Sequence, residues 1–348
     1  MKICKAPWNH IQINSEGTIN PCCMFFPTNY KKTYNSLQEA FDGSENAMLR
    51  QQMLDGKTID GCSKCDLYDK IGLEPLRNYF DHYDIDNPKI RELEYSFDNT
   101  CNFKCVTCNS RFSSKWLKDD IELHKLGISR PISKAIEQKK AYISFHEKMK
   151  QIDFSELQYL KLLGGEPFIN EKYLDLLQSI DLSNVTVMIT TNNSVFPKKW
   201  IDVFLRCKRL RLMISIDGID EVGEFVRYGM KQKKFTSNLR LWKDVSENND
   251  NVEISFNYVF NILNSFNLDK TLEYVKKEKI DGEFIVDYLT GPDYLNVQFL
   301  PDNIKNKIKL HISKYEHKEK IISFLNNKNF SDKIMKNFLM YCNFLENR

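Results

Sequence analysis

The pattern of hydrophobic and polar positions changes near residue 90. Before it, residues 10–14 and 18–20 alternate between apolar and polar side chains around a short turn, which predicts a β-hairpin. Residues 36–54 space their apolar side chains as a helix does, and Ser36 and Glu39 stand where a capping box would place them. The first 90 residues therefore predict a small, loop-rich module made of a hairpin and a helix.

Beyond residue 90 the pattern alternates between short apolar runs and helical spacing. The apolar runs lie at residues 93–97, 157–163, 185–191, 210–216, 252–260 and 284–289. Helical stretches between them lie at residues 173–180, 198–205, 221–228, 235–245 and 268–279. These repeats predict an α/β fold in which a parallel sheet curves into a partial (β/α)6 TIM-like barrel, with its chemistry at the carboxyl ends of the strands. Residues 111–149 are predicted to form a charged, mostly helical insertion after the first strand.

After Pro301 the chain is rich in lysine and asparagine and is predicted to be helical to its end. Acidic residues accompany the lysines there, which indicates a solvated helical face and not a nucleic-acid surface. The whole pattern predicts three parts: a cysteine-rich β-hairpin and helix module over residues 1–90, the barrel over 91–290, and a C-terminal helical extension over 291–348.

The overall charge argues against one broad class of partner. The 348 residues hold 50 Lys and Arg against 47 Asp and Glu, a net charge of +3, whereas non-specific phosphate binding needs a clear basic excess. No apolar run approaches the ~18 residues of a membrane span, and the start of the chain has no apolar stretch typical of a signal peptide. We therefore expect a cytoplasmic protein with no nucleic-acid partner and no membrane association.

Cysteines are unevenly distributed along the chain, with eight of the ten in the first 108 residues. One explanation for this cluster of cysteines is a disulfide framework, but such frameworks are typical of small exported domains. Cysteines at short spacings in a cytosolic protein indicate thiolate ligands of a metal or cluster. We expect such ligands among the first eight, and ordinary buried thiols at Cys207 and Cys342.

Three cysteines follow the first predicted barrel strand at the spacing C-x3-C-x2-C: Cys101, Cys105 and Cys108. A loop this short wraps three thiolates around one cluster and supplies no fourth protein ligand. One iron is then left open for an exogenous ligand, as an open catalytic zinc site keeps a position for water. At this point the sequence resembles the radical S-adenosylmethionine (SAM) superfamily, which implies a 4Fe-4S cluster that binds SAM.

Later strands extend the resemblance. Gly164-Gly165-Glu166 resembles the superfamily's GGEP turn, in which a backbone without Cβ atoms approaches the methionine amino group of SAM. Asn193 replaces the usual glycine of a TNG stretch, and asparagine is the next-best residue for a left-handed backbone. By the resemblance, Ser215 and Arg227 would contact the SAM carboxylate or ribose. The SAM-binding residues that the resemblance implies are Gly164, Gly165, Glu166, Asn192, Ser215 and Arg227.

The N-terminal cysteines have the pattern C-x12-G-x4-C followed by C-x2-C, which resembles the twitch, or half-SPASM, module of radical SAM enzymes. The resemblance implies an auxiliary 4Fe-4S cluster. The same spacing would also serve a four-cysteine zinc ribbon, and Cys23 is a possible substitute for Cys22. The ligands implied are Cys4, Cys22, Cys62 and Cys65.

The resemblance also implies a chemistry: SAM is cleaved reductively to a 5′-deoxyadenosyl radical, which abstracts a hydrogen atom from the substrate. A fully ligated auxiliary cluster favours a net oxidation. The expected partners are a reductant such as flavodoxin or ferredoxin and a peptide or protein substrate, with a small sugar-, aminocyclitol- or nucleoside-like molecule as the alternative. A non-catalytic zinc-binding scaffold is a more remote alternative, and the sequence indicates no general acid or base.

Overall fold

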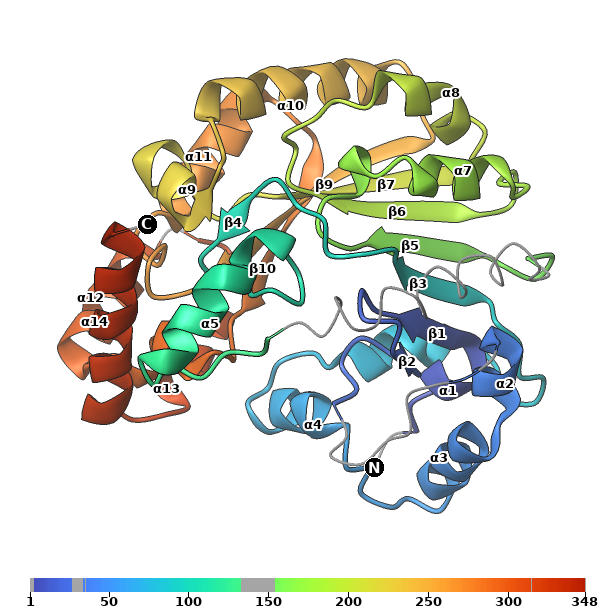
Figure 1. Ribbon diagram of the computed structural model, residues 1–348, viewed down its shortest axis with the longest axis horizontal. Helices are drawn as coiled ribbons and strands as arrows, with labels where there is room; N and C mark the ends of the chain where they lie inside the picture. The colour runs from blue at the N-terminus through green and yellow to red at the C-terminus, as the bar shows by residue number, and fades with distance from the viewer. Residues whose placement is uncertain (1–2, 27–33, 35, 133–153, 314, 348) are drawn as a thin grey trace. The chain divides into compact units, whose positions relative to one another are not determined.

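The computed structural model describes residues 3–26, 34, 36–132, 154–313 and 315–347, and these residues form an α/β fold (Figure 1). They fall into two compact units. The first contains the described residues of 1–99, 134–189 and 198–210, and the second contains those of 100–133, 190–197 and 211–348. The predicted division at residues 90 and 290 remains a prediction.

Five strands of the large sheet belong mainly to the first unit, in the order β2-β1-β3-β5-β6. Strands β3, β5 and β6 are parallel neighbours, with Leu93 opposite Leu160 and Leu160 opposite Val187. Their bounds are β1 (His10–Ile13), β2 (Ile19–Asn20), β3 (Glu92–Ser96), β5 (Tyr159–Leu163) and β6 (Thr186–Thr191).

The predicted N-terminal hairpin is confirmed, because β1 and β2 pair antiparallel around Gly17, whose φ is 73°. Strand β1 also pairs in parallel with β3, with His10 opposite Glu92. The cysteine-rich segment thus adds strands to the sheet, a pairing that the local pattern did not predict.

Three further strands of the large sheet belong mainly to the second unit, in the order β7-β9-β10. They are β7 (Arg209–Ser215), β9 (Val252–Phe260) and β10 (Gly282–Tyr288), and β9 and β10 are parallel over seven residue pairs. A separate small sheet pairs β4 (Lys104–Cys105) antiparallel with β8 (Arg227–Tyr228). All six predicted barrel strands are present, and within the described residues the sheet is open, because β2 and β10 have one neighbour each, as expected for a partial barrel.

The helix predicted over residues 36–54 is wrong in one respect, because it is two helices. Ser36 caps the first, its hydroxyl accepting from the Glu39 N–H at 3.0 Å. The break lies at Gly43, whose backbone is extended (ψ 164°) and whose Cβ, if present, would lie 2.5 Å from the Glu39 carbonyl oxygen. The helical segments of the first unit are α1 (Ala6–Asn9), α2 (Leu37–Asp42), α3 (Ser44–Leu54), α4 (Ser63–Lys70), η1 (Leu76–His82), η3 (Pro167–Ile169), α7 (Lys172–Gln178), η4 (Lys198–Trp200) and α8 (Ile201–Phe204).

The second unit contains the remaining helices, and α10 illustrates why they form. Phe235, Leu239 and Trp242 recur at helical spacing and are buried, which gives this helix one apolar face. The helical segments are η2 (Ser114–Trp116), α5 (Leu117–Lys125), α9 (Asp220–Val226), α10 (Gln232–Glu247), α11 (Leu268–Glu278), η5 (Asp293–Leu295), η6 (Val297–Phe299), α12 (Asp302–His311), α13 (Lys318–Asn326) and α14 (Asp332–Glu346).

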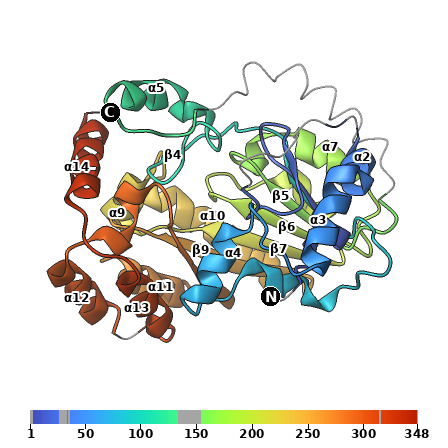
Figure 2. The same cartoon turned by 90° about the horizontal axis from the view of Figure 1, so that it is seen from below.

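The predicted helical extension is confirmed by α12, α13 and α14, which Figure 2 shows grouped at one end of the second unit. The predicted insertion contains α5, and its residues 133–149 lie outside the described residues. Among the helices of the described ranges, none is both long and apolar enough to cross a membrane.

Candidate functional site

The three-cysteine loop follows β3 and is held by local hydrogen bonds. The Phe103 N–H donates to the Cys101 sulfur at 3.4 Å, and the Cys108 N–H donates to the Cys105 carbonyl at 3.0 Å. Cys105 lies in β4, directly opposite Arg227 in β8. All ten cysteines of the chain are described, and all are free thiols.

Arg227 brings a buried positive charge beside this loop. Its Nη1 donates to the Asp217 carboxylate at 2.5 Å, and a second oxygen of Asp217 accepts from the Val259 N–H at 2.8 Å. A hydrogen bond from the Cys108 thiol, together with the Arg227 charge, holds the pKa of Cys105 below its usual value although burial opposes this. The same hydrogen bond and burial raise the pKa of Cys108. The loop therefore has one thiol whose pKa is lowered and one whose pKa is raised.

The Nε–H of Arg227 is buried and has no hydrogen-bond partner within the described residues. Buried donors are nearly always paired in folded proteins, so an unpaired one beside two thiols indicates an acceptor that binds there. The sulfides of an iron–sulfur cluster and the carboxylate of SAM both supply acceptor atoms. The residues present therefore fit a cluster with bound SAM at this loop.

Asn192 and its neighbours form a turn after β6 that reaches the same loop. The Asn192 amide donates to Asn102 Oδ1 at 2.9 Å and lies 3.8 Å from the Cys101 sulfur. Asn102 in turn donates to the Ser194 hydroxyl at 2.8 Å. Asn193 has a φ of 57°, so the left-handed backbone expected at this position is confirmed. In this structure Asn192 orients the cysteine loop, and a contact with SAM stays a prediction.

The Gly-Gly-Glu turn follows β5 and has little room around it. Gly164 has a φ of +135°, and a Cβ there would lie 2.5 Å from the Tyr173 hydroxyl and 2.9 Å from the Asp98 carbonyl oxygen. The Gly165 N–H donates to that same carbonyl at 3.2 Å. Glu166 is buried, and its carboxylate accepts from the Phe168 N–H at 3.2 Å. Only glycine fits the first position of this turn.

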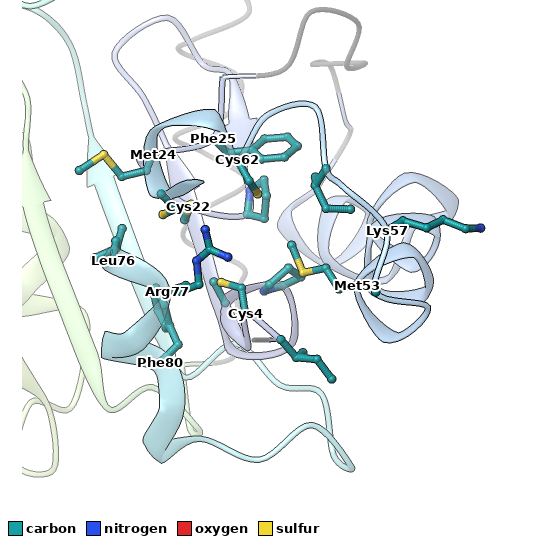
Figure 3. Close-up of a pocket in the computed structure, with 17 residues that line it drawn as sticks. Cys4, Cys22, Met24, Phe25, Met53, Lys57, Cys62, Leu76, Arg77 and Phe80 are labelled. Atoms are coloured by element: carbon teal, nitrogen blue, oxygen red, sulfur yellow. The ribbon is translucent and has the colours of Figure 1, made fainter. Parts of the chain in front are cut away.

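The N-terminal cysteines predicted as auxiliary ligands line one cavity that is partly open to solvent (Figure 3). Its cysteines are Cys4, Cys22, Cys62 and Cys65. Burial and the nearby thiols raise the pKa of Cys4 to about 11 and that of Cys62 to about 12. Burial likewise raises the pKa of Cys22 well above its usual value. Four thiolates can share this cavity only with a compensating cation or cluster, whose binding would release their protons.

Arg77 is a residue of this cavity that the sequence analysis missed. It is buried, and one Nη lies 2.6 Å from Asp66 and 3.2 Å from Asp69. Its Nε–H is also without a partner in the described part of the chain. Figure 3 shows the Arg77 side chain between Cys4 and Cys22. An Arg77 N–H that has no partner among the described residues, close to four thiols, fits the binding of an anionic cluster. No three Cys, His, Asp or Glu side chains among the described residues are grouped closely enough to hold a single metal ion.

Cys23 does not line the cavity, although it follows Cys22 directly. Its thiol donates a hydrogen bond to the Glu94 carboxylate, and burial and that carboxylate raise its pKa to about 12. Glu94 also accepts from Gln12 at 2.7 Å and from Lys161 at 3.2 Å. The geometry therefore groups Cys22, and not Cys23, with the other three cysteines of the cavity.

The Glu94–Lys161 pair was also missed by the sequence analysis. Gln12, Glu94 and Lys161 are in register on three neighbouring strands, so their side chains lie on one face of the sheet. The signal that could have identified the pair was a charged residue, Glu94 or Lys161, inside each of two predicted apolar strands.

Comparison with known protein families agrees with this arrangement. Residues 95–275, about half of the chain, match the radical SAM superfamily, and residues 4–66 match an iron–sulfur cluster-binding domain of the SPASM type. The chain belongs to the radical SAM superfamily of enzymes. The cofactors of these two domains are SAM with its iron–sulfur cluster and an auxiliary iron–sulfur cluster. The N-terminal match is thus to a cluster domain and not to a zinc ribbon.

Individual relatives are more distant. The GTP 3′,8-cyclase of Clostridium perfringens (strain SM101 / Type A) is 24% identical over 204 residues, which are 56% of this chain and 55% of that protein. The chain therefore spans about half the length of this curated relative. Streptococcus suis SuiB bound to S-adenosylmethionine is 14% identical, with a TM-score of 0.42 over 84% of this chain and 62% of that chain. The native anSMEcpe structure with bound AdoMet is 18% identical, with a TM-score of 0.41 over 66% and 61%.

For this radical SAM chain, the individual ligand and SAM contacts remain predictions. The structure groups two predicted residues, Asn192 and Arg227, with the three-cysteine loop. Ser215 is half-buried at the carboxyl end of β7. Gly164, Gly165 and Glu166 form the turn after β5.

Replacing Gly164 with alanine is expected to lower the free energy of unfolding by about 3 kcal/mol or more. Backbone strain at this φ contributes about 1–3 kcal/mol, and the contact with the rigid Asp98 carbonyl adds an overpacking cost of similar size. The measurement is urea denaturation of the apoprotein. The control is Gly127→Ala, which has a φ of +82° but no atom within 4 Å of its Cβ, so it should cost only about 1–2 kcal/mol. Equal losses in the two variants would contradict the steric argument.

Replacing Lys161 with methionine is expected to destabilise this radical SAM chain in a pH-dependent way. Burial raises the pKa of Glu94, but the charges of Lys161 and His10 and the hydrogen bonds outweigh it, so the net shift is downward. Glu94 therefore stabilises the wild type above its unfolded pKa, and this stabilisation is lost as the pH falls. Without Lys161 the buried carboxylate loses its largest compensating charge, which costs about 3–5 kcal/mol at neutral pH.

Below about pH 5, protonation of Glu94 removes its uncompensated charge in the Lys161→Met variant, so the deficit relative to the wild type should shrink. Urea denaturation at pH 7 and pH 5 measures this. The control is Lys199→Met, whose ion pair with Glu171 spans 3.4 Å between side chains that are 79% and 80% exposed, so its loss should cost at most about 1 kcal/mol. A Lys161→Met deficit that is the same at both pH values would count against a buried, charged Glu94.

Proposed function

We propose that this chain is an enzyme that reductively cleaves SAM and uses the resulting 5′-deoxyadenosyl radical to abstract a hydrogen atom from its substrate. The observation that carries the proposal is the three-cysteine loop beside Arg227, whose buried Nε–H has no partner among the described residues. When bound at this loop and reduced, a 4Fe-4S cluster with an open iron supplies the electron for this chemistry.

The chain's own residues prepare the site for such a cofactor. The hydrogen bond from the Cys108 thiol and the Arg227 charge lower the pKa of Cys105. Asp217 holds the guanidinium in place through a charge-assisted hydrogen bond and is itself held by the backbone of β9. The donor that remains on Arg227 is available to a carboxylate or sulfide. We propose SAM binding through Asn192, Ser215, Arg227 and the turn at Gly164, Gly165 and Glu166.

The cavity lined by the N-terminal cysteines supports a net oxidation of the substrate. Four cysteines, Cys4, Cys22, Cys62 and Cys65, would saturate an auxiliary cluster, leaving no open iron for SAM. A saturated cluster is suited to accept or relay an electron. The electron that enters at the SAM site would come from a reductant such as flavodoxin or ferredoxin, and the ten free thiols are consistent with work in the reducing cytoplasm.

For the substrate we propose a peptide or protein side chain. The helical extension exposes large apolar side chains on different helices, among them Leu310 at 76% and Leu339 at 58%, and these side chains are available for contacts with a polypeptide. The similarity to a GTP 3′,8-cyclase favours a second candidate, a nucleotide or another small nucleoside-like molecule.

Anaerobic reconstitution tests the proposal. With iron, sulfide and dithionite, the chain should bind about eight irons, the sum of two four-iron clusters, and should convert SAM to methionine and 5′-deoxyadenosine. Mass spectrometry after incubation with a peptide library and, separately, with GTP would distinguish the substrate classes. Stoichiometric zinc without SAM cleavage would overturn the proposal and favour a zinc-binding scaffold. If SAM is cleaved and a substrate reacts but its product is not oxidised, the proposed net oxidation is wrong.

A further inference from the structure

The backbone carbonyls of the three-cysteine loop are bound by side chains from distant parts of the second unit. Donors from η2, α14 and the segment after α5 each reach a different carbonyl. The pairs are Trp116 Nε1 to the Cys105 carbonyl at 2.9 Å, the Tyr341 hydroxyl to the Val106 carbonyl at 2.8 Å, and Arg130 Nη2 to the Cys108 carbonyl. Tyr341 comes from the C-terminal extension, 235 residues beyond Val106 in sequence.

Arg130 is the centre of this arrangement. Its Nη1 donates to the Tyr341 hydroxyl at 2.8 Å, and its Nε lies 2.9 Å from an Asp120 carboxylate oxygen. Its guanidinium carbon lies 4.3 Å from the centre of the Trp116 ring and 5.2 Å from that of Tyr341. The second Asp120 oxygen accepts from the Ser110 N–H at 2.6 Å, just beyond the last cysteine of the loop.

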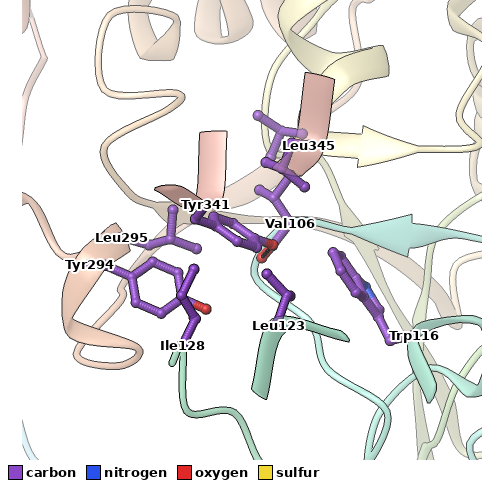
Figure 4. Close-up of a cluster of buried hydrophobic side chains, with 9 residues drawn as sticks. Val106, Trp116, Leu123, Ile128, Tyr294, Leu295, Tyr341 and Leu345 are labelled. Atoms are coloured by element: carbon purple, nitrogen blue, oxygen red, sulfur yellow. Dashed lines mark hydrogen bonds between the residues drawn. The ribbon is translucent and has the colours of Figure 1, made fainter. Parts of the chain in front are cut away.

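These groups are removed from water. Trp116, Asp120 and Tyr341 have no exposed surface, and Arg130 is only 6% exposed. Figure 4 shows Trp116 and Tyr341 beside Val106 within one cluster of buried apolar side chains. A buried ion pair whose members also donate and accept further hydrogen bonds specifies one arrangement strongly, because losing any member leaves another unsatisfied.

We propose that Tyr341 and Arg130 are positioning residues for the SAM-binding cluster, and that through them α14 fixes the geometry of the cysteine loop. This inference rests on the proposed function. The carbonyls of Cys105, Val106 and Cys108 set the orientation of the peptide groups that carry the thiols. Donors on these carbonyls therefore hold the loop in one form before any cofactor binds. The extension thus acts on the site through Tyr341, without itself contributing a ligand.

The test compares Tyr341→Phe with Tyr315→Phe. The first removes only the hydroxyl that joins Arg130 to the Val106 carbonyl, while the ring keeps its place in the stack. The control removes a hydroxyl from the same extension, on a ring that packs edge-on against His317. A third variant, Arg130→Lys, keeps the charge but loses the planar fork of donors.

The first readout is amide hydrogen exchange in the apoprotein, which needs no cluster. We expect residues 101–110 to exchange about two- to twelvefold faster in Tyr341→Phe, because the loop loses its hydrogen bond from the Tyr341 hydroxyl, worth about 0.5–1.5 kcal/mol. The Tyr315→Phe control should match the wild type. Exchange equal to the wild type in both Tyr341→Phe and Arg130→Lys would overturn the proposal.

The second readout is made on the reconstituted enzyme. Tyr341→Phe should weaken SAM binding about three- to tenfold, while iron content stays near the wild-type value. The change that SAM addition causes in the electron paramagnetic resonance signal of the cluster should also differ from that of the wild type. A variant that is only less stable would keep its affinity and its signal, and that result would also overturn the proposal. If the wild type itself binds no SAM, the proposed function fails, and the exchange result still decides whether these residues position the loop.

Discussion

Changing Cys101, Cys105 and Cys108 together to alanine is expected to abolish SAM cleavage while leaving about half of the iron in the protein. The reason is that the two sets of cysteines lie on different segments: three on the loop after β3, and four lining a cavity of the first unit. A four-iron cluster in the remaining cavity would leave about four irons per chain. Iron analysis and chromatographic assay of 5′-deoxyadenosine measure the two effects.

The control for this triple variant is Cys342→Ala, which removes a half-buried thiol of α14 and should change neither iron content nor SAM cleavage. If the triple variant bound no iron, the two sites would depend on each other. If it kept all of the iron, the loop would not be a cluster site, and the proposed function would be wrong.

Changing Cys22 to alanine is expected to separate SAM cleavage from product formation. Its thiol lines the cavity that also contains Cys4, Cys62 and Cys65, so its loss should remove the proposed auxiliary cluster while the three-cysteine loop stays intact. Loss of partners outside the metal's direct ligands already costs 10–100-fold in many metal sites, so loss of a ligand should lower oxidised product by at least about 100-fold. Assays of 5′-deoxyadenosine and of substrate product on the same sample measure both outcomes.

Cys23→Ala is the matched control, because the two thiols are adjacent in sequence and face different groups. Cys23 hydrogen-bonds Glu94, so its loss should cost about 1 kcal/mol of stability and leave the iron content unchanged. Iron lost from Cys23→Ala but kept in Cys22→Ala would reverse the ligand assignment. Iron kept in both variants would show that neither thiol is required to hold the auxiliary cluster.

Local patterns in the chain predicted most of the secondary structure. The six barrel strands were found because each is a short buried run, as in β9, where Phe256, Tyr258 and Phe260 alternate with less buried residues. The single helix predicted over residues 36–54 failed at Gly43, where apolar spacing continues through a break in the backbone. Helical periodicity alone does not register an extended residue between two short helices.

The pairings that complete the candidate sites were not predictable in the same way. The β4–β8 ladder sets Cys105 opposite Arg227, more than one hundred residues apart in sequence. Strand β1 likewise pairs with a distant segment, with His10 opposite Glu92 in β3. Such contacts depend on how distant segments pack, and no spacing rule within a short window contains that information.

The sequence by itself determined the family and the kind of chemistry, because thiolate ligands of a cluster come from short loops whose spacing is visible in the chain. Only the tertiary structure decided which of the adjacent thiols Cys22 and Cys23 lines the cavity with the other N-terminal cysteines. It also decided that the buried Arg77 and Arg227 each have a donor without a partner among the described residues. It also decided that Tyr341 of the last helix reaches the cysteine loop. These features depend on the direction of side chains and on contacts between distant segments, which folding alone brings together.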